Sequence, residues 1–169
     1  MVIDMQNDFI DVALGTKRAE RILPAVAAKI AEYKNNGNDV IFTRDTHYEN
    51  YPETLEGRNL PVPHCIENTP GHDISSLLDT IGCEIINKNT FGSLALAELA
   101  AAKKYDEIEL CGLCTDICVV SNALILRAAL PDTEIKLDAG CCAGVTEESH
   151  EAALATMRMC QISVYGANG

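Results

Sequence analysis

Short apolar runs rich in valine and isoleucine recur along the chain, and stretches with helical spacing of apolar residues separate them. Most of these runs do not alternate between apolar and polar residues, which is typical of strands buried on both faces of a sheet. They predict strands at 2–3, 39–43, 84–87, 107–111, 134–137 and 161–164. The first run is very short, which leaves open whether further residues precede it in the natural chain.

Four helices are expected between these strands. One spans about 24–36, because Pro24 suits a first helical turn and Gly37 suits the end of a helix. The others follow Ser93, Thr115-Asp116 and Thr146. Strands that alternate with helices at this spacing form βαβ units, which build a parallel sheet with helices on both faces. We therefore expect one α/β domain over 1–169, a three-layer α/β/α sandwich with a mostly parallel, Rossmann-like sheet of about six strands.

Composition narrows the possible functions. The formal net charge of −12 argues against a surface for nucleic acid or acidic membranes, because phosphate binding needs clustered lysine and arginine. No apolar run reaches the length of a membrane span and no signal peptide precedes the first strand, so we expect a cytoplasmic protein. Most of the eight cysteines lie in apolar runs, where a free cysteine acts as a small hydrophobic residue, as expected in a reducing compartment.

Reactive side chains collect at the carboxyl ends of the expected strands, where open α/β sheets bind their ligands. In chain order they are Asp4, Asp45, His47, Lys88 and Cys118. The polar, proline-rich segment 46–73 follows the second strand, and a loop of that length in a compact domain is usually functional. The pattern predicts a reaction site at this edge of the sheet.

Cys118 lies a few residues into an expected helix, where free backbone amides and the helix dipole favour a thiolate and can hold an oxyanion. The alternative is a small buried residue, but the carboxylate and lysine at the same edge favour a nucleophile. The spacing Cys111-x-x-Cys114-x-x-x-Cys118 also invites a metal site or a redox dithiol. Both are less favoured, because no second cysteine pair matches this one and Cys111 belongs to a strand.

Asp45, His47 and His64 form a candidate site for a divalent metal such as Zn²⁺, Mn²⁺ or Fe²⁺. Three protein ligands would leave positions open for water or substrate, as in catalytic rather than structural metal sites. The alternative is two ordinary surface histidines and a turn aspartate. The remaining histidines, His72 and His150, are expected in capping, packing or surface roles.

The chain resembles the isochorismatase-like cysteine hydrolases, the group that includes nicotinamidases. Five motifs carry this resemblance in the right order, and together they span nearly the whole chain: 2–9, 43–47, 63–71, 88–91 and 112–119. The resemblance implies the isochorismatase-like hydrolase fold and a catalytic triad of Asp4, Lys88 and Cys118. It also implies a cis peptide bond at Leu113–Cys114, with the amides of Cys114 and Cys118 as the oxyanion hole.

The substrate is left open by a departure from the nicotinamidase pattern. Nicotinamidases typically carry tryptophans near the metal motif and before the third ligand, whereas this chain contains no tryptophan and has Thr46 and Val62 nearby. Phe9, Tyr48 and Phe91 can still form the floor of a small pocket.

The expected function is a cysteine hydrolase that cleaves a small carboxamide to acid and ammonia through a thioester, with a divalent metal and no organic cofactor. Self-association into a homo-oligomer is expected by analogy with the family. The alternatives are an N-carbamoyl or other cysteine hydrolase of the same fold, and a catalytically silent binding protein.

Overall fold

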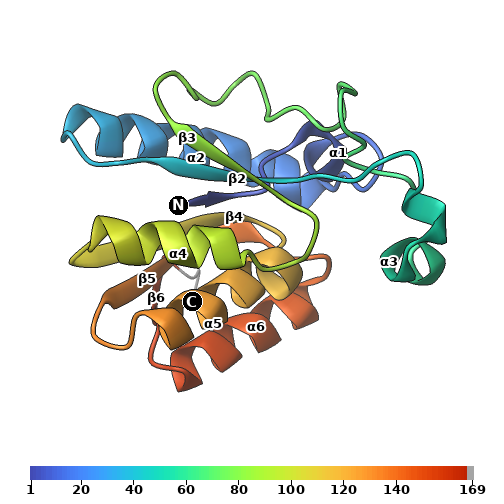
Figure 1. Ribbon diagram of the computed structural model, residues 1–169. Coiled ribbons are helices and arrows are strands. Elements are labelled where there is room, and N and C mark those ends of the chain that lie inside the picture. The colour runs from blue at the N-terminus through green and yellow to red at the C-terminus, as the bar shows by residue number, and fades with distance from the viewer. Residues whose placement is uncertain (167–169) are drawn as a thin grey trace.

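In the part of the chain that the structure describes, residues 1–166 of a computed structural model, six parallel strands form one sheet (Figure 1). The strand order is β3-β2-β1-β4-β5-β6. The strands are β1 (Val2–Ile3), β2 (Ile41–Asp45), β3 (Glu84–Lys88), β4 (Glu107–Leu113), β5 (Glu134–Ala143) and β6 (Ser163–Tyr165). The expected doubly wound α/β sheet is confirmed.

Helices cover both faces of this sheet (Figure 1). The helices of the described chain are α1 (Asn7–Ile10), α2 (Lys17–Asn35), α3 (Leu55–Asn59), α4 (Leu94–Lys103), α5 (Val120–Ala129) and α6 (Glu147–Met159). The connection through α2 steps from β1 to β2, whereas those through α4, α5 and α6 step the opposite way along the sheet. Because βαβ crossovers are right-handed, α2 lies on one face and the other three on the opposite face. Within residues 1–166 no helix has both the length and the apolarity needed to cross a bilayer.

The helix expected at 24–36 begins earlier, at Lys17, and Pro24 lies inside it. The Thr16 side chain caps the helix by accepting a hydrogen bond from the backbone N–H of Ala19 at 3.1 Å. A side-chain cap stabilises a helix start by about 1 kcal/mol, and Val26 and its neighbours on the same face pack into the core. These contacts outweigh the hydrogen bond that a proline removes from the helix interior.

Several strands extend beyond their expected ends. β5 reaches Ala143 instead of residue 137, because polar and small residues interrupt its apolar run without ending the ladder to β4. β2 covers 41–45 and ends on Asp45 itself. β3 is an edge strand and largely exposed, so the expected burial on both faces does not hold there.

The segment 46–73 contains two short helices, α3 and the single 3₁₀ turn η1 (Tyr51–Glu53), rather than loop alone. Thr54 caps α3 by accepting a hydrogen bond from the N–H of Gly57 at 2.9 Å. α3 projects from one end of the molecule (Figure 1). The segment returns to the sheet through a bridge between His47 and Ile66, which brings its second half next to the end of β2.

Gly112 allows β4 to approach β1 at the point where the two strands lead into the site. Its φ is +119°, and a Cβ at this position would lie 2.1 Å from the carbonyl oxygen of Ile3. Backbone atoms cannot retreat as the end of a flexible side chain can, so only glycine fits here.

Replacement of Gly112 by alanine is expected to lower the free energy of unfolding by at least 2–4 kcal/mol, because it adds both a steric clash and left-handed strain. Gly37→Ala is the matched control, since Gly37 also has a positive φ, of +73°, but no atom within 4 Å of the added Cβ. Urea unfolding followed by circular dichroism measures both. Equal losses in the two variants would contradict the close contact with β1.

Candidate active site

Four polar side chains from different strands meet at the carboxyl edge of the sheet. Asp4 follows β1, Asp45 ends β2, Lys88 ends β3, and Cys118 lies in η2 (Thr115–Val119), a π-helical turn after β4. Asp45 and Lys88 are direct partners in the register of the parallel ladder. Sheet pairing therefore brings together residues that are up to 114 positions apart in the sequence.

Lys88 is the centre of this group. Its side chain is only 2% exposed, and Nζ lies 2.6 Å from Asp4 Oδ2, 3.3 Å from Asp45 Oδ1 and 3.6 Å from Cys118 Sγ. Burial alone lowers the pKa of a lysine, but the nearby anionic groups, Asp4 first, more than offset this and raise the pKa of Lys88 above its ordinary value. Lys88 is therefore an ammonium ion.

Asp4 is held in a strained, fully buried conformation, with φ +47°. The Thr43 hydroxyl donates to Asp4 Oδ1 at 2.6 Å and accepts from the backbone N–H of Asp4 at 3.2 Å. Oδ2 lies 2.6 Å from Lys88 Nζ, at ion-pair distance. Burial raises the pKa of Asp4 and outweighs the opposing effect of Lys88, so this carboxylate is a stronger base than usual.

Cys118 is a thiol rather than a thiolate in this environment. Burial, followed by the charge of Asp4, raises its pKa well above the ordinary value, while Lys88 acts in the opposite direction. The expectation that the helix start favours a thiolate is not met, because the loss of water around the sulfur outweighs this effect.

The cis peptide bond expected at Leu113–Cys114 is not found, since every peptide bond among the described residues is trans. Gly112, with its positive φ, turns the chain at this point, and Cys114 continues in an extended conformation with φ −85° and ψ 145°. The trans form is lower in energy by about 2.5–4 kcal/mol for a non-proline bond. Leu113 and Cys114 both line the cavity next to Cys118.

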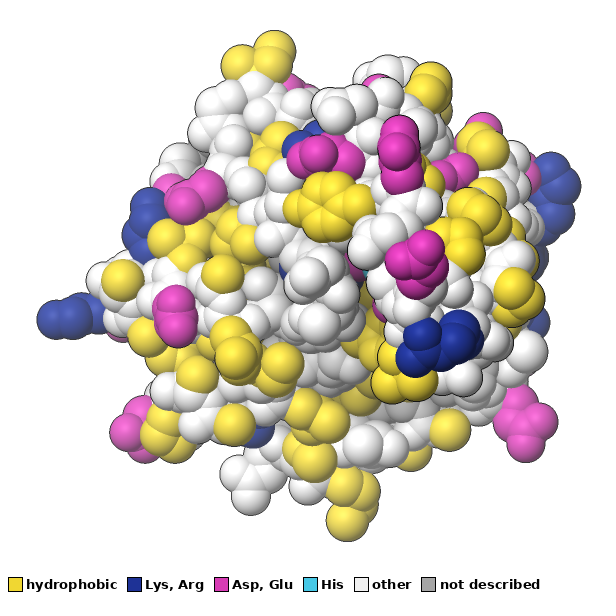
Figure 2. Space-filling model, turned by 45° about the vertical axis from the view of Figure 1, so that its right-hand side comes forward, with side chains coloured by type: hydrophobic (Ala, Val, Ile, Leu, Met, Phe, Trp, Pro, Cys, Tyr) yellow, Lys and Arg dark blue, Asp and Glu magenta, His cyan; other side chains and the backbone are white. Residues whose placement is uncertain are grey.

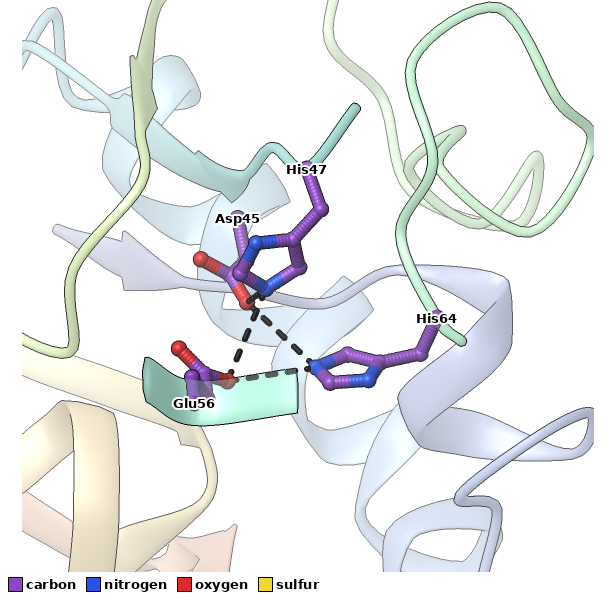
Figure 3. A group of neighbouring side chains, drawn as sticks. All are labelled: Asp45, His47, Glu56 and His64. Atoms are coloured by element: carbon purple, nitrogen blue, oxygen red, sulfur yellow. Dashed lines mark ion pairs between the residues drawn. The ribbon is translucent and has the colours of Figure 1, made fainter. Parts of the chain in front are cut away.

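A second cluster adjoins the first through Asp45, and Figure 3 shows its four side chains converging. His47 Nε2 lies 3.1 Å from Asp45 Oδ2, and His64 Nε2 lies 3.8 Å from the same oxygen. Glu56, from α3, completes the group with Oε1 3.6 Å from the Nε2 atom of each histidine. Glu56 is the ligand candidate that the sequence did not identify.

The donor atoms of this cluster fit a divalent cation. One ligand atom from each of the four residues lies within 4.8 Å of the others. His47 Nε2 is buried without a hydrogen-bond partner, although Asp45 is near. His64 Nδ1 donates to the carbonyl of Val62 at 2.8 Å, which leaves Nε2 with its lone pair directed into the cluster. Two imidazoles and two carboxylates are a common ligand set for Zn²⁺, Mn²⁺ or Fe²⁺.

Two side chains near the first strand hold the cluster in place. Gln6 donates to the carbonyls of Asp45 at 2.8 Å and His72 at 2.9 Å, and it accepts from the N–H of Asp45 at 2.7 Å. Asp8 accepts from the N–H of Cys65, the residue after the loop histidine of the cluster, at 2.7 Å. The end of β2 and the returning segment are therefore fixed relative to each other by buried polar contacts.

The two clusters border a cavity of about 330 Å³ that is lined largely by apolar side chains, and Cys118 lies in its wall. Phe9 and Phe91, two of the three aromatic residues expected to form the floor of a pocket, line this cavity. Tyr48 does not, and it lines a neighbouring groove instead. A cavity of this size and composition accommodates a small organic molecule.

The other two histidines lie outside both clusters. His72 is buried in a turn, with Nε2 2.9 Å from the hydroxyl of Thr46. His150, in α6, has Nδ1 2.8 Å from the hydroxyl of Thr115. Neither histidine lines the cavity next to Cys118.

A doubly wound α/β sheet with a buried aspartate, lysine and cysteine at its carboxyl edge is the arrangement expected of an enzyme with a cysteine nucleophile. Within this class the chain belongs to the Isochorismatase family, since the Isochorismatase domain model matches residues 1–167. The protein is therefore an Isochorismatase-family hydrolase.

Named relatives are nicotinamidases and pyrazinamidases. The nicotinamidase/pyrazinamidase of Mycobacterium tuberculosis is 25% identical over 97% of this chain and 96% of its own length. The crystal structure of a Pyrococcus horikoshii pyrazinamidase in complex with zinc matches with a TM-score of 0.86 and 29% identity, over 98% of this chain and 97% of that one. A nicotinamidase/pyrazinamidase structure from Bacillus subtilis gives a TM-score of 0.87 and 26% identity, over 96% of each chain.

Lys88→Met is expected to lower the free energy of unfolding by about 3–5 kcal/mol at pH 7, because it leaves buried carboxylates without their counter-ion. Folding already raises the pKa of Asp4, and removal of the ammonium ion raises it further. Protonation of Asp4 at low pH relieves the unpaired charge, so the loss relative to the unmodified protein should shrink as the pH falls and grow as it rises.

Urea unfolding at pH 7 and at pH 4.5 tests this dependence. Lys103→Met, which removes an exposed lysine 3.5 Å from Asp39, serves as the control and should change stability little at either pH. A loss in Lys88→Met that does not depend on pH would argue against charge as its cause.

Proposed function

We propose that the protein is a cysteine-dependent amidohydrolase that cleaves a small carboxamide to a carboxylic acid and ammonia. The observation that carries this proposal is the position of Lys88 Nζ, 2.6 Å from Asp4 Oδ2 and 3.6 Å from Cys118 Sγ, beside a largely apolar cavity of about 330 Å³. The similarity to nicotinamidases and pyrazinamidases along nearly the whole chain supports the same assignment.

In the first half of the reaction Asp4 removes the proton from the Cys118 thiol, and the sulfur attacks the carboxamide carbon. The raised pKa of Asp4 suits a base, and the raised pKa of the Cys118 thiol explains why a base is needed. Lys88 stabilises the anionic forms of both groups. Asp4 then returns the proton to the nitrogen, the C–N bond breaks, and ammonia leaves a thioester on Cys118.

Water completes the cycle by attacking the thioester carbon. Asp4 accepts one proton from this water and returns it to the departing sulfur, so that the acid is released and the Cys118 thiol is restored. In both halves the backbone amides of Cys114 and Cys118 hold the oxyanion. Both residues line the cavity at the start of a helical turn, where the first amides lack an acceptor within the helix.

Asp45, His47, Glu56 and His64 would hold a divalent cation, and the zinc complex of the Pyrococcus horikoshii relative supports this assignment. When bound, such a cation supplies Lewis acidity and orients a polar substrate atom. Asp45 links this cluster to Lys88, because its Oδ1 lies 3.3 Å from Nζ. Glu56 and His64 line the same cavity as Cys118.

Cys118→Ala is expected to lower the rate of ammonia release by at least about a thousandfold, because it removes the nucleophile. The substrates are a panel of small primary amides that includes nicotinamide and pyrazinamide, assayed for ammonia. Cys160→Ala, at the end of α6 and away from the cavity, controls for the loss of a thiol and should keep full activity. Unchanged ammonia release by Cys118→Ala would rule out the mechanism, and no release from any amide would rule out the proposed activity.

Protein purified without chelator should contain about one equivalent of divalent metal per chain, measured by plasma mass spectrometry. Glu56→Gln should weaken metal binding by roughly 10- to 100-fold, because it replaces a charged ligand candidate with a neutral amide. Glu53→Gln, an exposed residue two positions before α3, should bind metal as the unmodified protein does. Chelation should reduce amidase activity, and added Zn²⁺, Mn²⁺ or Fe²⁺ should restore it. Full activity in metal-free protein would contradict a catalytic metal.

A further inference from the structure

A second hollow lies beside the catalytic cavity and shares part of its lining. It has a volume of about 630 Å³, compared with about 330 Å³ for the cavity at Cys118. Four residues line both spaces: Glu56, Leu60, Phe91 and Ile117. We call this second space the outer groove. It lies between the chain that follows β2, the helix α3 and the loop after β3.

The lining of the outer groove is apolar and almost uncharged. Tyr48, Leu55 and Phe91 contribute large side chains that are 53%, 69% and 47% exposed. Asparagine and threonine residues provide the polar groups, and the only lining residues that can carry charge near neutral pH are His47 and Glu56. Both of these belong to the metal-ligand cluster at the inner end. Figure 2 turns the side with α3 toward the viewer and shows yellow hydrophobic side chains across this face, with charged side chains among them.

The position of the outer groove relates it to the reaction. A molecule with its carboxamide carbon at Cys118 would reach the groove past the four shared residues, of which Leu60, Phe91 and Ile117 are apolar and Glu56 is acidic. An anionic arm would lose its hydration along this path and meet Glu56, since no lysine or arginine lines either space. A cationic arm would compete for Glu56 with His47 and His64, whose Nε2 atoms already lie 3.6 Å from Oε1. An apolar group instead gains from removing exposed leucine and aromatic surface from water.

We propose that the preferred substrate is a primary carboxamide that bears an uncharged apolar arm, and that the arm lies in the outer groove against Leu55 and Phe91. This inference rests on the proposed amidohydrolase function. Binding energy from an arm remote from the reacting carbon can be used to position the carboxamide, so its loss reduces kcat/KM. The outer groove thus determines which amides the enzyme prefers, while Asp4, Lys88 and Cys118 determine the reaction.

The test compares butanamide with 4-phenylbutanamide, which share the carboxamide end and differ by a phenyl arm. The kcat/KM for 4-phenylbutanamide, from ammonia release, should exceed that for butanamide by at least tenfold. In Leu55→Ala the ratio of the two values should fall by about tenfold. Leu77→Ala is the matched control, because Leu77 is 70% exposed, as Leu55 is 69% exposed, but lies in the segment before β3 and outside both spaces.

Equal kcat/KM for the two amides, or an unchanged ratio in Leu55→Ala, would overturn the assignment of the outer groove while leaving the amidase function intact. If neither amide is hydrolysed, the binding of both amides to Cys118→Ala is measured by calorimetry, which tests the outer groove without the reaction. Tighter binding of 4-phenylbutanamide than of butanamide, weakened by Leu55→Ala, would support the groove even though the reaction assignment had failed. Equal binding would overturn it.

Sedimentation velocity on the same variants tests another occupant of the outer groove. Should the protein self-associate, and should Leu55→Ala alone release monomers with no change in amide preference, this surface would be an interface between copies. That result would contradict a role in substrate binding.

Discussion

The ammonium group of Lys88 is buried where water cannot solvate it, and the arrangement of the site depends on how its charge is neutralised. Asp4 and Asp45 lie within 3.3 Å of Nζ, and Cys118 Sγ lies at 3.6 Å. A buried charge is tolerated only when its partners are fixed, because any loss of contact restores the full desolvation cost. The charge of Lys88 is therefore neutralised only if the ends of β1, β2 and β3 and the turn after β4 keep fixed positions relative to one another. The contacts of Lys88 with Asp4, Asp45 and Cys118 therefore hold the site together and also hold the ends of the strands together.

The order of residues along the chain was enough to predict which polar side chains meet at the edge of the sheet. Asp4, Asp45 and Lys88 stand at or just after the ends of predicted strands, Cys118 follows in the turn after the fourth strand, and parallel strands bring their carboxyl ends to one edge. The fold class was predictable for the same reason, since alternating strands and helices leave few possible topologies. These residues could be placed together before any coordinates were known.

Other features depend on the path of the chain in space and could not be predicted. Glu56 joins the histidine cluster only because α3 forms within a segment that has no apolar periodicity. The helix start at Lys17 depends on a cap and on packing that outweigh the signal from Pro24. The pKa of the Cys118 thiol is raised mainly by burial, and burial depends on elements far away in the sequence, so the residues around Cys118 do not predict it.

The edge position of β3 affects how the protein unfolds on heating. β3 pairs with β2 alone, most of its residues are exposed, and yet its last residue is Lys88. Edge elements with few buried contacts open locally at a lower free energy than the whole domain unfolds. Fraying of this strand removes the ammonium group while β1, β4 and β5 remain paired. The protein can therefore pass through a folded but inactive state on heating, in which loss of activity precedes loss of secondary structure.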